Sequence, residues 1–353
     1  MTSGPKGKAL RGKNALSLFN QGRDIWNESV QEYTRIDFSG LNLADQPEPC
    51  ANFDGFIFPA ATAFRKTQFG DNGVSFRNAR FLEGPVSFDQ ADFGTATVDF
   101  CGAQFQDGGV SFTEAQFGEG EALFDDVQFG DGDVDFGGAV FGGERVSFIN
   151  AQFGDGDIDF SGVQFGDGSF EFSSARFGKG SVNFVESEFG DGPVDFSHTD
   201  FGSGNTFFRN TCFGNGSVCF DHAQFGEGVT SFGESRFCRG PVSFRCVQFS
   251  EGVVSFMDVS FGDGDIFFDA ILFGSGDVYF NKAQFGCGKV SFEGTPIDGS
   301  NIHFDNVYKD GAPFSHDMHI FAGSAARQGK TNFLARGMAK LGDWAKGQVN
   351  EQK

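Results

Sequence analysis

The sequence predicts an all-β solenoid, a rod of stacked coils with a helical cap at each end, from three observations. First, phenylalanine recurs with gaps that alternate between seven and five residues, as at positions 129, 136, 141, 148, 153, 160 and 165. Second, the 353 residues include 51 Phe and 53 Gly, a composition typical of a repetitive array. Third, the first Phe of a twelve-residue unit returns from Phe69 to Phe285 without a slip.

Each twelve-residue unit supplies four inward-pointing residues. The unit reads F-G-x-G-x-V-x-F-x-x-A-x, and its Val and Ala slots carry no charge anywhere in the array. The inward residues are paired two positions apart, which is the alternation of a β-strand and not the period of a helix. The Gly-rich links are suited to corners. One unit cannot bury its own apolar side, so the units are expected to stack as a solenoid.

The five-residue steps resemble those of the pentapeptide-repeat proteins, which have a large apolar residue at the centre and a small one two positions before. Matching steps are Ala139-Val140-Phe141, Ala151-Gln152-Phe153, Ile36-Asp37-Phe38, Leu41-Asn42-Leu43 and Ala51-Asn52-Phe53. The resemblance covers roughly residues 34 to 308 and implies a right-handed quadrilateral β-helix with four steps per coil. Every second step here is two residues longer, so a coil of two twelve-residue units is expected, with G-x-G loops at two opposite corners.

Each Phe is then a rung of one of four interior ladders. Coils spaced ~4.8 Å apart, like strands in a sheet, would make the array from Phe69 to Phe304 about ten coils and roughly 48 Å long. The core ladder is expected to include five rungs in the middle of the array: Phe136, Phe148, Phe160, Phe172 and Phe184. A fully buried Phe contributes about 1.5–3 kcal/mol to stability.

The ends divide the chain into three parts. Residues 1–33 form a tail and capping helix, 34–308 the solenoid, and 309–353 a loop and an amphipathic helix. One helix is predicted over residues 14–34, with Leu16, Phe19, Ile25, Trp26 and Val30 as its apolar residues. A second is predicted over 331–348, either as a cap on the last coil or as a dimerisation helix, through Leu334, Met338, Leu341 and Trp344.

The charge is concentrated in the array. The formal net charge is −22, but between Phe69 and Tyr308 there are 37 acids and 11 bases. This excess disfavours direct binding of nucleic acid or an anionic membrane, and it favours a protein partner with a basic surface. No stretch reaches the ~20 apolar residues of a membrane helix, and the basic N-terminus lacks the apolar run of a signal peptide. Seven cysteines without a CxxC pair indicate reduced thiols in the cytoplasm.

The sequence contains no motif typical of an enzyme. Nucleophile elbow, P-loop, dinucleotide fingerprint and zinc-finger spacing are all missing, which predicts a non-enzymatic protein without a cofactor. A coil of two units aligns His198, His222 and Cys246, but the outer two would lie ~9.6 Å apart, which suits a tetrahedral metal site badly. The HxxH segment at His316 and His319 is equally weak evidence, so no metal site is predicted.

Carboxylates also align at a spacing of 24. The predicted interaction surface is this acidic corner, made of Asp131, Asp133, Asp135, Asp155, Asp157 and Asp159. Carboxylates in register repel one another, and calcium could relieve that repulsion. GDGD is similar to the turns of calcium-binding β-rolls, but those repeat every nine residues. A solvated acidic corner is therefore the favoured interpretation. Gln104, Gln128 and Gln152 form a further column, resumed by Gln224 and Gln248, which is interpreted as a structural amide stack.

Three functions are compatible with such a rod. Some pentapeptide-repeat proteins mimic B-form DNA and bind DNA gyrase or topoisomerase IV as dimers, so the resemblance implies a DNA mimic. The array carries about one net charge per 1.8 Å of its expected length, against one per ~1.7 Å in double-stranded DNA. The alternatives are a scaffold or effector that binds another protein, and a cation-binding solenoid.

Overall fold

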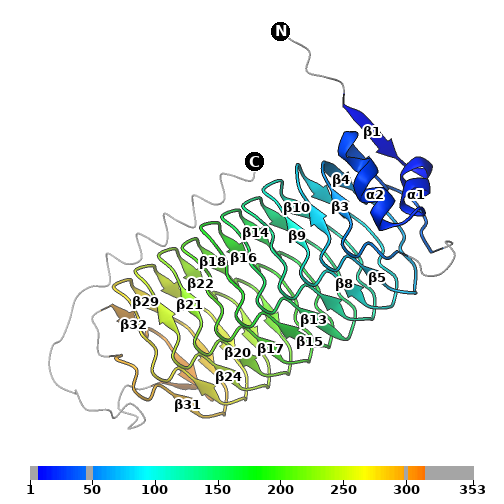
Figure 1. Cartoon of the computed structure of the whole chain (residues 1–353). Helices are drawn as coiled ribbons and strands as arrows, with labels where there is room; N and C mark the ends of the chain where they lie inside the picture. Colours follow the sequence, from blue (N-terminus) through cyan, green and yellow to red (C-terminus); the bar gives the residue numbers. More distant parts are fainter. Residues whose placement is uncertain (1–6, 45–50, 298–300, 315–353) are drawn as a thin grey trace, which may run out of the picture.

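The chain folds into a β-solenoid of stacked coils with its helices at the N-terminal end (Figure 1). The computed structural model describes residues 7–44, 51–297 and 301–314. Within the array the strand residues pair in parallel with those 24 positions later, as Val110 does with Val134 and Val134 with Ile158. The expected coil length of two twelve-residue units is therefore confirmed.

Each coil has four sides, named faces A to D in chain order. Face A is a sheet of thirteen strands: β1 (Lys8–Arg11), β2 (Tyr33–Asp37), β4 (Ala61–Ala63), β7 (Val86–Ser87), β10 (Val110–Ser111), β12 (Val134–Asp135), β14 (Ile158–Asp159), β16 (Val182–Asn183), β18 (Thr206–Phe207), β22 (Thr230–Ser231), β26 (Val254–Ser255), β29 (Val278–Tyr279) and β32 (Ile302–His303). Face C is a sheet of ten: β5 (Val74–Ser75), β8 (Val98–Asp99), β11 (Ala122–Leu123), β13 (Arg145–Ser147), β15 (Ser169–Glu171), β17 (Val194–Asp195), β20 (Val218–Cys219), β24 (Val242–Ser243), β28 (Ile266–Phe267) and β31 (Val290–Ser291).

Faces B and D are narrower, and in the middle of the rod their coils are joined by single β-bridges such as Gln116↔Val140 and Gln128↔Gln152. Toward the C-terminal end face B has the strands β19 (Cys212–Phe213), β23 (Arg236–Phe237), β27 (Ser260–Phe261), β30 (Gln284–Phe285), β33 (Tyr308–Lys309) and the antiparallel β34 (Ala312–Pro313). Face D has β3 (Ile57–Phe58), β6 (Arg80–Phe81) and β9 (Gln104–Phe105), then β21 (Gln224–Phe225) and β25 (Gln248–Phe249).

The interior consists of phenylalanine ladders. On face A the rings stack from Phe38 to Phe304, for example Phe160 on Phe184 with centroids 4.8 Å apart. The face C ladder meets it edge to face, as between Phe148 and Phe160 at 84°. All five predicted rungs have no exposed surface. Phe172 is tilted by 31° from Phe148 because Phe170 fills a Val slot beside it, 5.0 Å away.

The seven-residue steps form the long B–C and D–A corners, at opposite edges of the coil. Glycine occupies most of the positions where successive corners touch. A Cβ on Gly154 would lie 2.0 Å from the carbonyl oxygen of Gly130 in the preceding coil, and one on Gly180 would lie 1.9 Å from that of Gly156. At these positions glycine lets neighbouring corners approach at the strand spacing without a steric clash.

The N-terminal cap differs from the single predicted helix. The structure has α1 (Lys13–Phe19), α2 (Arg23–Ser29) and a 3₁₀ turn, Val30–Glu32. Gly22, with φ 93°, separates the two helices, because a left-handed residue cannot continue a helix. Trp26 packs on Phe38 and Phe58, whereas Ile25 is exposed. The unpredicted strand β1 pairs with β2 and extends face A beyond the first coil.

Candidate interaction surface

The D–A corner carries four of the six predicted acidic residues. Asp131 and Asp155 stack in one column, and Asp133 and Asp157 stack in the next, with all four exposed. Asp135 and Asp159 lie on face A itself, opposite each other in β12 and β14, and are half-buried. The six side chains therefore form one continuous patch over two coils.

The stacked carboxylates accept backbone hydrogen bonds from the next coil, which the sequence did not predict. The backbone N–H of Asp155 donates to Asp131 Oδ1 at 3.1 Å, and that of Asp157 donates to Asp133 Oδ1 at 2.9 Å. The N–H of Ser181 continues the second column by donating to Asp157 Oδ1 at 2.7 Å. Each carboxylate thus accepts a hydrogen bond from the next coil, which offsets part of the repulsion between like charges.

The two half-buried aspartates, Asp135 and Asp159, stabilise the turns that follow them. Asp135 Oδ1 accepts the N–H of Gly137 at 2.7 Å, and Asp159 Oδ1 accepts that of Ser161 at 2.8 Å. Both bonds span two residues, the pattern in which an aspartate closes a turn on its own backbone. These carboxylates therefore stabilise the ends of the face A strands as well as adding charge.

Hydrogen bonding lowers the pKa of several corner carboxyl groups. The Lys179 ammonium bonds to Asp155 and lowers the pKa of that carboxyl group. On the B–C corner, the backbone N–H and side chain of Asn215 lower the pKa of Asp191, and those of Cys287 lower the pKa of Asp263. These groups remain ionised at neutral pH, so the corners keep their charge.

Several of the array's basic residues lie against acids. Arg77 contacts Asp99 at 2.5 Å and Arg145 contacts Glu171 at 2.6 Å, while Arg245 lies 3.5 Å from Asp269. The bonds from Glu171 and Asp99 raise the pKa of the two arginines that they touch. These pairs neutralise part of the array's charge, but acids still outnumber bases on both long corners.

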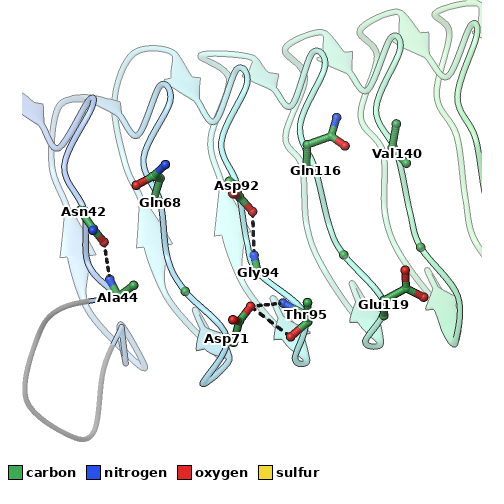
Figure 2. Close-up of a pocket in the computed structure, with 13 residues that line it drawn as sticks. Asn42, Ala44, Gln68, Asp71, Asp92, Gly94, Thr95, Gln116, Glu119 and Val140 are labelled. Atoms are coloured by element: carbon green, nitrogen blue, oxygen red, sulfur yellow. Dashed lines mark hydrogen bonds between the residues drawn. The ribbon is translucent and has the colours of Figure 1, made fainter.

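A shallow groove of about 530 Å³ runs along face B and the B–C corner in the N-terminal half (Figure 2). Asp71 Oδ1 accepts both the N–H and the hydroxyl of Thr95 at 3.0 Å, and Asp92 Oδ1 accepts the N–H of Gly94. Its charged lining residues are Asp71, Asp92 and Glu119. The second long corner is thus acidic as well.

The predicted His–Cys column exists, and its backbone explains its position. His198, His222 and Cys246 adopt the left-handed conformation with φ of 57°, 61° and 57°. Their neighbours at the same position in other coils share it, because the short five-residue turn requires it. The two imidazole rings stack face to face at 4.8 Å. In the described ranges no three His, Cys, Asp or Glu residues lie close enough to hold a metal ion.

The glutamine columns lie on face D. Gln104, Gln128 and Gln152 pair in register through backbone bridges, and Gln224 pairs with Gln248, with every side chain exposed. His316, His319 and the residues Leu334, Met338, Leu341 and Trp344 of the predicted C-terminal helix lie outside the described residues.

The described thiols are free. Six cysteines, all except Cys50, are described, and none of these forms a disulfide. Burial raises the pKa of Cys101 to about 12 and that of Cys219 to about 11. None of the helices in the described ranges has the length and apolar character needed to cross a membrane.

Two solved structures align with about three quarters of this chain, at low sequence identity and low TM-scores. No family model and no curated protein matches the sequence. HetL, a pentapeptide repeat protein involved in heterocyst differentiation regulation from the cyanobacterium Nostoc sp. strain PCC 7120, aligns over 75% of this chain and 92% of its own at 10% identity and a TM-score of 0.22. QnrB1, a plasmid-mediated fluoroquinolone resistance protein, aligns in trypsin-treated form over 77% and 92% at 14% identity, with a TM-score of 0.18.

At these scores the two structures say nothing about the function of this chain. The fold class is assigned from the geometry of its coils. Four-sided coils, inward phenylalanines every five to seven residues and parallel pairing at 24 are the features that the pentapeptide-repeat resemblance implies. The chain is a four-sided β-solenoid with 24 residues per coil. Its five- and seven-residue steps alternate.

Proposed function

We propose that the protein is a non-enzymatic interaction protein and that its long acidic corners mimic double-stranded DNA toward DNA gyrase or topoisomerase IV. The supporting observation is the pair of carboxylate columns on opposite corners of the coil. On the D–A corner Asp131 and Asp155 stand in successive coils, and on the B–C corner Asp167 and Asp191 do the same. Two parallel lines of negative charge on one rod are the feature that a protein built to bind duplex DNA would recognise.

Coulomb attraction would govern such binding. Ions screen exposed charges over ~8 Å at physiological salt, so affinity is expected to fall steeply as salt rises. Duplex DNA is expected to compete for the same basic surface of the partner. A scaffold that binds a partner without DNA-binding activity would show little competition from duplex DNA.

The test is a supercoiling assay with purified gyrase, with and without this protein. The informative variant replaces Asp131, Asp133, Asp135, Asp155, Asp157 and Asp159 by Asn, which removes six charges and retains one acceptor oxygen at each position. A matched control removes six charges from the B–C corner by converting Asp71, Asp167, Asp191, Asp263 and Asp265 to Asn and Glu119 to Gln.

We expect wild type to inhibit supercoiling or to protect gyrase from a poison, and the D–A variant to lose that effect. Loss in the D–A variant alone would assign the contact to that corner, whereas equal loss in both would assign it to the charge of the whole rod. No effect of wild type at micromolar concentration would remove the DNA-mimic proposal and favour a scaffold.

A further inference from the structure

The outer side of face A is unusually well covered near its C-terminal end. The shelf is defined here as the outward side chains of Ser255, Met257, Tyr279, Asn281 and His303, from three successive coils. Tyr279 is 6% exposed and Asn281 is 8% exposed, although both point away from the phenylalanine core. Ser255, at 5%, is equally buried.

Neighbours in the ladder account for the burial of Ser255, because Ser87 and Ser231, at the same outward position of face A but outside the shelf, are 7% and 4% exposed. They do not account for the burial of the larger Tyr279 side chain. Phe267 is the matched case on the opposite face, a large aromatic at the outward position of β28. It is also half-buried, even though the Arg245 guanidinium lies over its ring at 3.7 Å. Tyr279 has the His303 ring stacked at 4.7 Å and is nevertheless far more buried.

Two buried polar atoms on the shelf lack a hydrogen-bond partner among the described residues. Asn281 donates from Nδ2 to Asp305 Oδ2 at 3.2 Å, but its buried Oδ1 accepts no hydrogen bond from a described residue. The buried Nε2 of His303 likewise makes no hydrogen bond within the described part of the chain, although it lies 3.8 Å from Asp277 Oδ1. Buried polar atoms in native proteins are nearly always hydrogen-bonded, so a further partner is expected here.

We propose that this partner is the chain's own segment 331–348, docked along face A over the shelf. Its predicted apolar side, Leu334, Met338 and Leu341, would cover the Tyr279 ring and the Met257 side chain, and its polar groups would satisfy the two unpaired atoms. Residues 315–353 contain six bases and three acids, which complements an acidic rod.

The lengths fit this placement. The described chain reaches Phe314 just after β34, at the C-terminal end of the rod. The linker from 315 to 330 can span tens of ångströms at up to about 3.3 Å per residue. A helix over 331–348 is about 27 Å long, or between five and six coils at ~4.8 Å. Laid along face A from β32, it would cover the shelf and end near Asp159 of β14.

Native lysines provide the first test, with the unmodified full chain. Lys282 follows Asn281, is exposed and lies 3.5 Å from Asp258. At high dilution, an amine-reactive cross-linker is expected to join Lys282 to Lys340 or Lys346 within monomers. Links found only in dimers would assign the shelf to the tail of a second copy and overturn the proposal.

The second test measures access to the shelf in the full chain. Ser255→Cys is labelled with a thiol reagent and read by peptide mass spectrometry, with Ser243→Cys at the matched outward position of β24 as control. Replacing Leu334, Met338 and Leu341 by Asp should speed labelling at position 255 at least tenfold and leave position 243 unchanged. The proposal would be overturned by equal labelling rates at position 255 with the wild-type and the substituted tail, provided that both proteins have the same melting temperature.

Discussion

The phenylalanine interior and the aspartate corners repeat with the same period of 24, but stacked rings attract one another whereas stacked carboxylates repel. Identical rings gain from stacking, so Phe136, Phe160 and Phe184 form a continuous buried ladder. Identical carboxylates repel, but Asp131 and Asp155 are tolerated in register because both are exposed and both accept a hydrogen bond from the next coil. Asp131 accepts the backbone N–H of Asp155, and Asp155 accepts the Lys179 ammonium. The interior therefore determines the fold, and the corners are left to determine what the rod presents to a partner.

The largest effect is expected from breaking the register that both regions share. Deleting the six positions from Gly130 to Asp135 would place the long corners of later coils over the short turns of earlier ones. We expect loss of cooperative melting. Deleting one full period, Gly130 to Phe153, removes one whole coil and should leave a folded, soluble rod. If the full-period deletion proves the more damaging of the two, the coil assignment is wrong.

The interior alone is tested by Phe160→Ala. The ring has no exposed surface and stacks on neighbours 5.0 and 4.8 Å away, so its removal leaves a cavity between them. The free energy of unfolding should fall by about 3–5 kcal/mol. Denaturant unfolding measures this, and a loss below about 1 kcal/mol would mean that the ladder does not carry the stability of the fold.

The backbone of the corners is tested by Gly154→Ala. The new Cβ would meet the Gly130 carbonyl oxygen at 2.0 Å, so the coils must separate locally, at an expected cost of about 1–3 kcal/mol. Gly143→Ala is the control, since its Cβ would meet only the end of the Glu119 side chain at 3.1 Å. The control should melt close to wild type, and equal losses in the two variants would argue against tight corner stacking.

A smaller effect is expected from pH. Hydrogen bonds lower the folded-state pKa of Asp191 and Asp263, so their contribution is present above the unfolded value near 3.9 and is lost as pH falls through the folded value. The melting temperature should therefore drop below about pH 4. Asp191→Asn combined with Asp263→Asn should flatten that drop. A double variant with an unchanged pH profile would show that these bonds do not stabilise the rod.

The sequence predicted the repeat better than it predicted the surface. Phe, Val and Ala slots at fixed spacing identify the inward side chains, and stacking at 24 follows from the four steps per coil that the pentapeptide-repeat resemblance implies. A single glycine, Gly22, was too weak a signal to divide the predicted N-terminal helix into two. Strand β1 could not be predicted because it forms by pairing with β2, and both helices lie between these strands in the sequence. The left-handed turns at positions such as Glu114 have no residue-type signature, since the closed coil imposes them.

The acidic corner shows why the rest could not be predicted. Sequence alignment at 24 places carboxylate above carboxylate, but it does not show which backbone N–H groups lie between them. That knowledge requires the corner geometry, in which the N–H of Asp157 points at Asp133. Burial of Tyr279 was likewise not apparent from the sequence, because its slot is outward-facing in every coil.

The central claim is that the corner carboxylates are dispensable for the fold and available to a partner. The direct measurement is the free energy of unfolding of the variant with Asn at positions 131, 133, 135, 155, 157 and 159. Asn retains the acceptor that Asn205 already supplies to the N–H of Val229 at 2.9 Å, and it removes the repulsion between stacked charges. We predict a stability equal to or above wild type. A loss of more than about 2 kcal/mol, well outside the scatter of neutral surface changes, would contradict the claim and show that these charges hold the coils together.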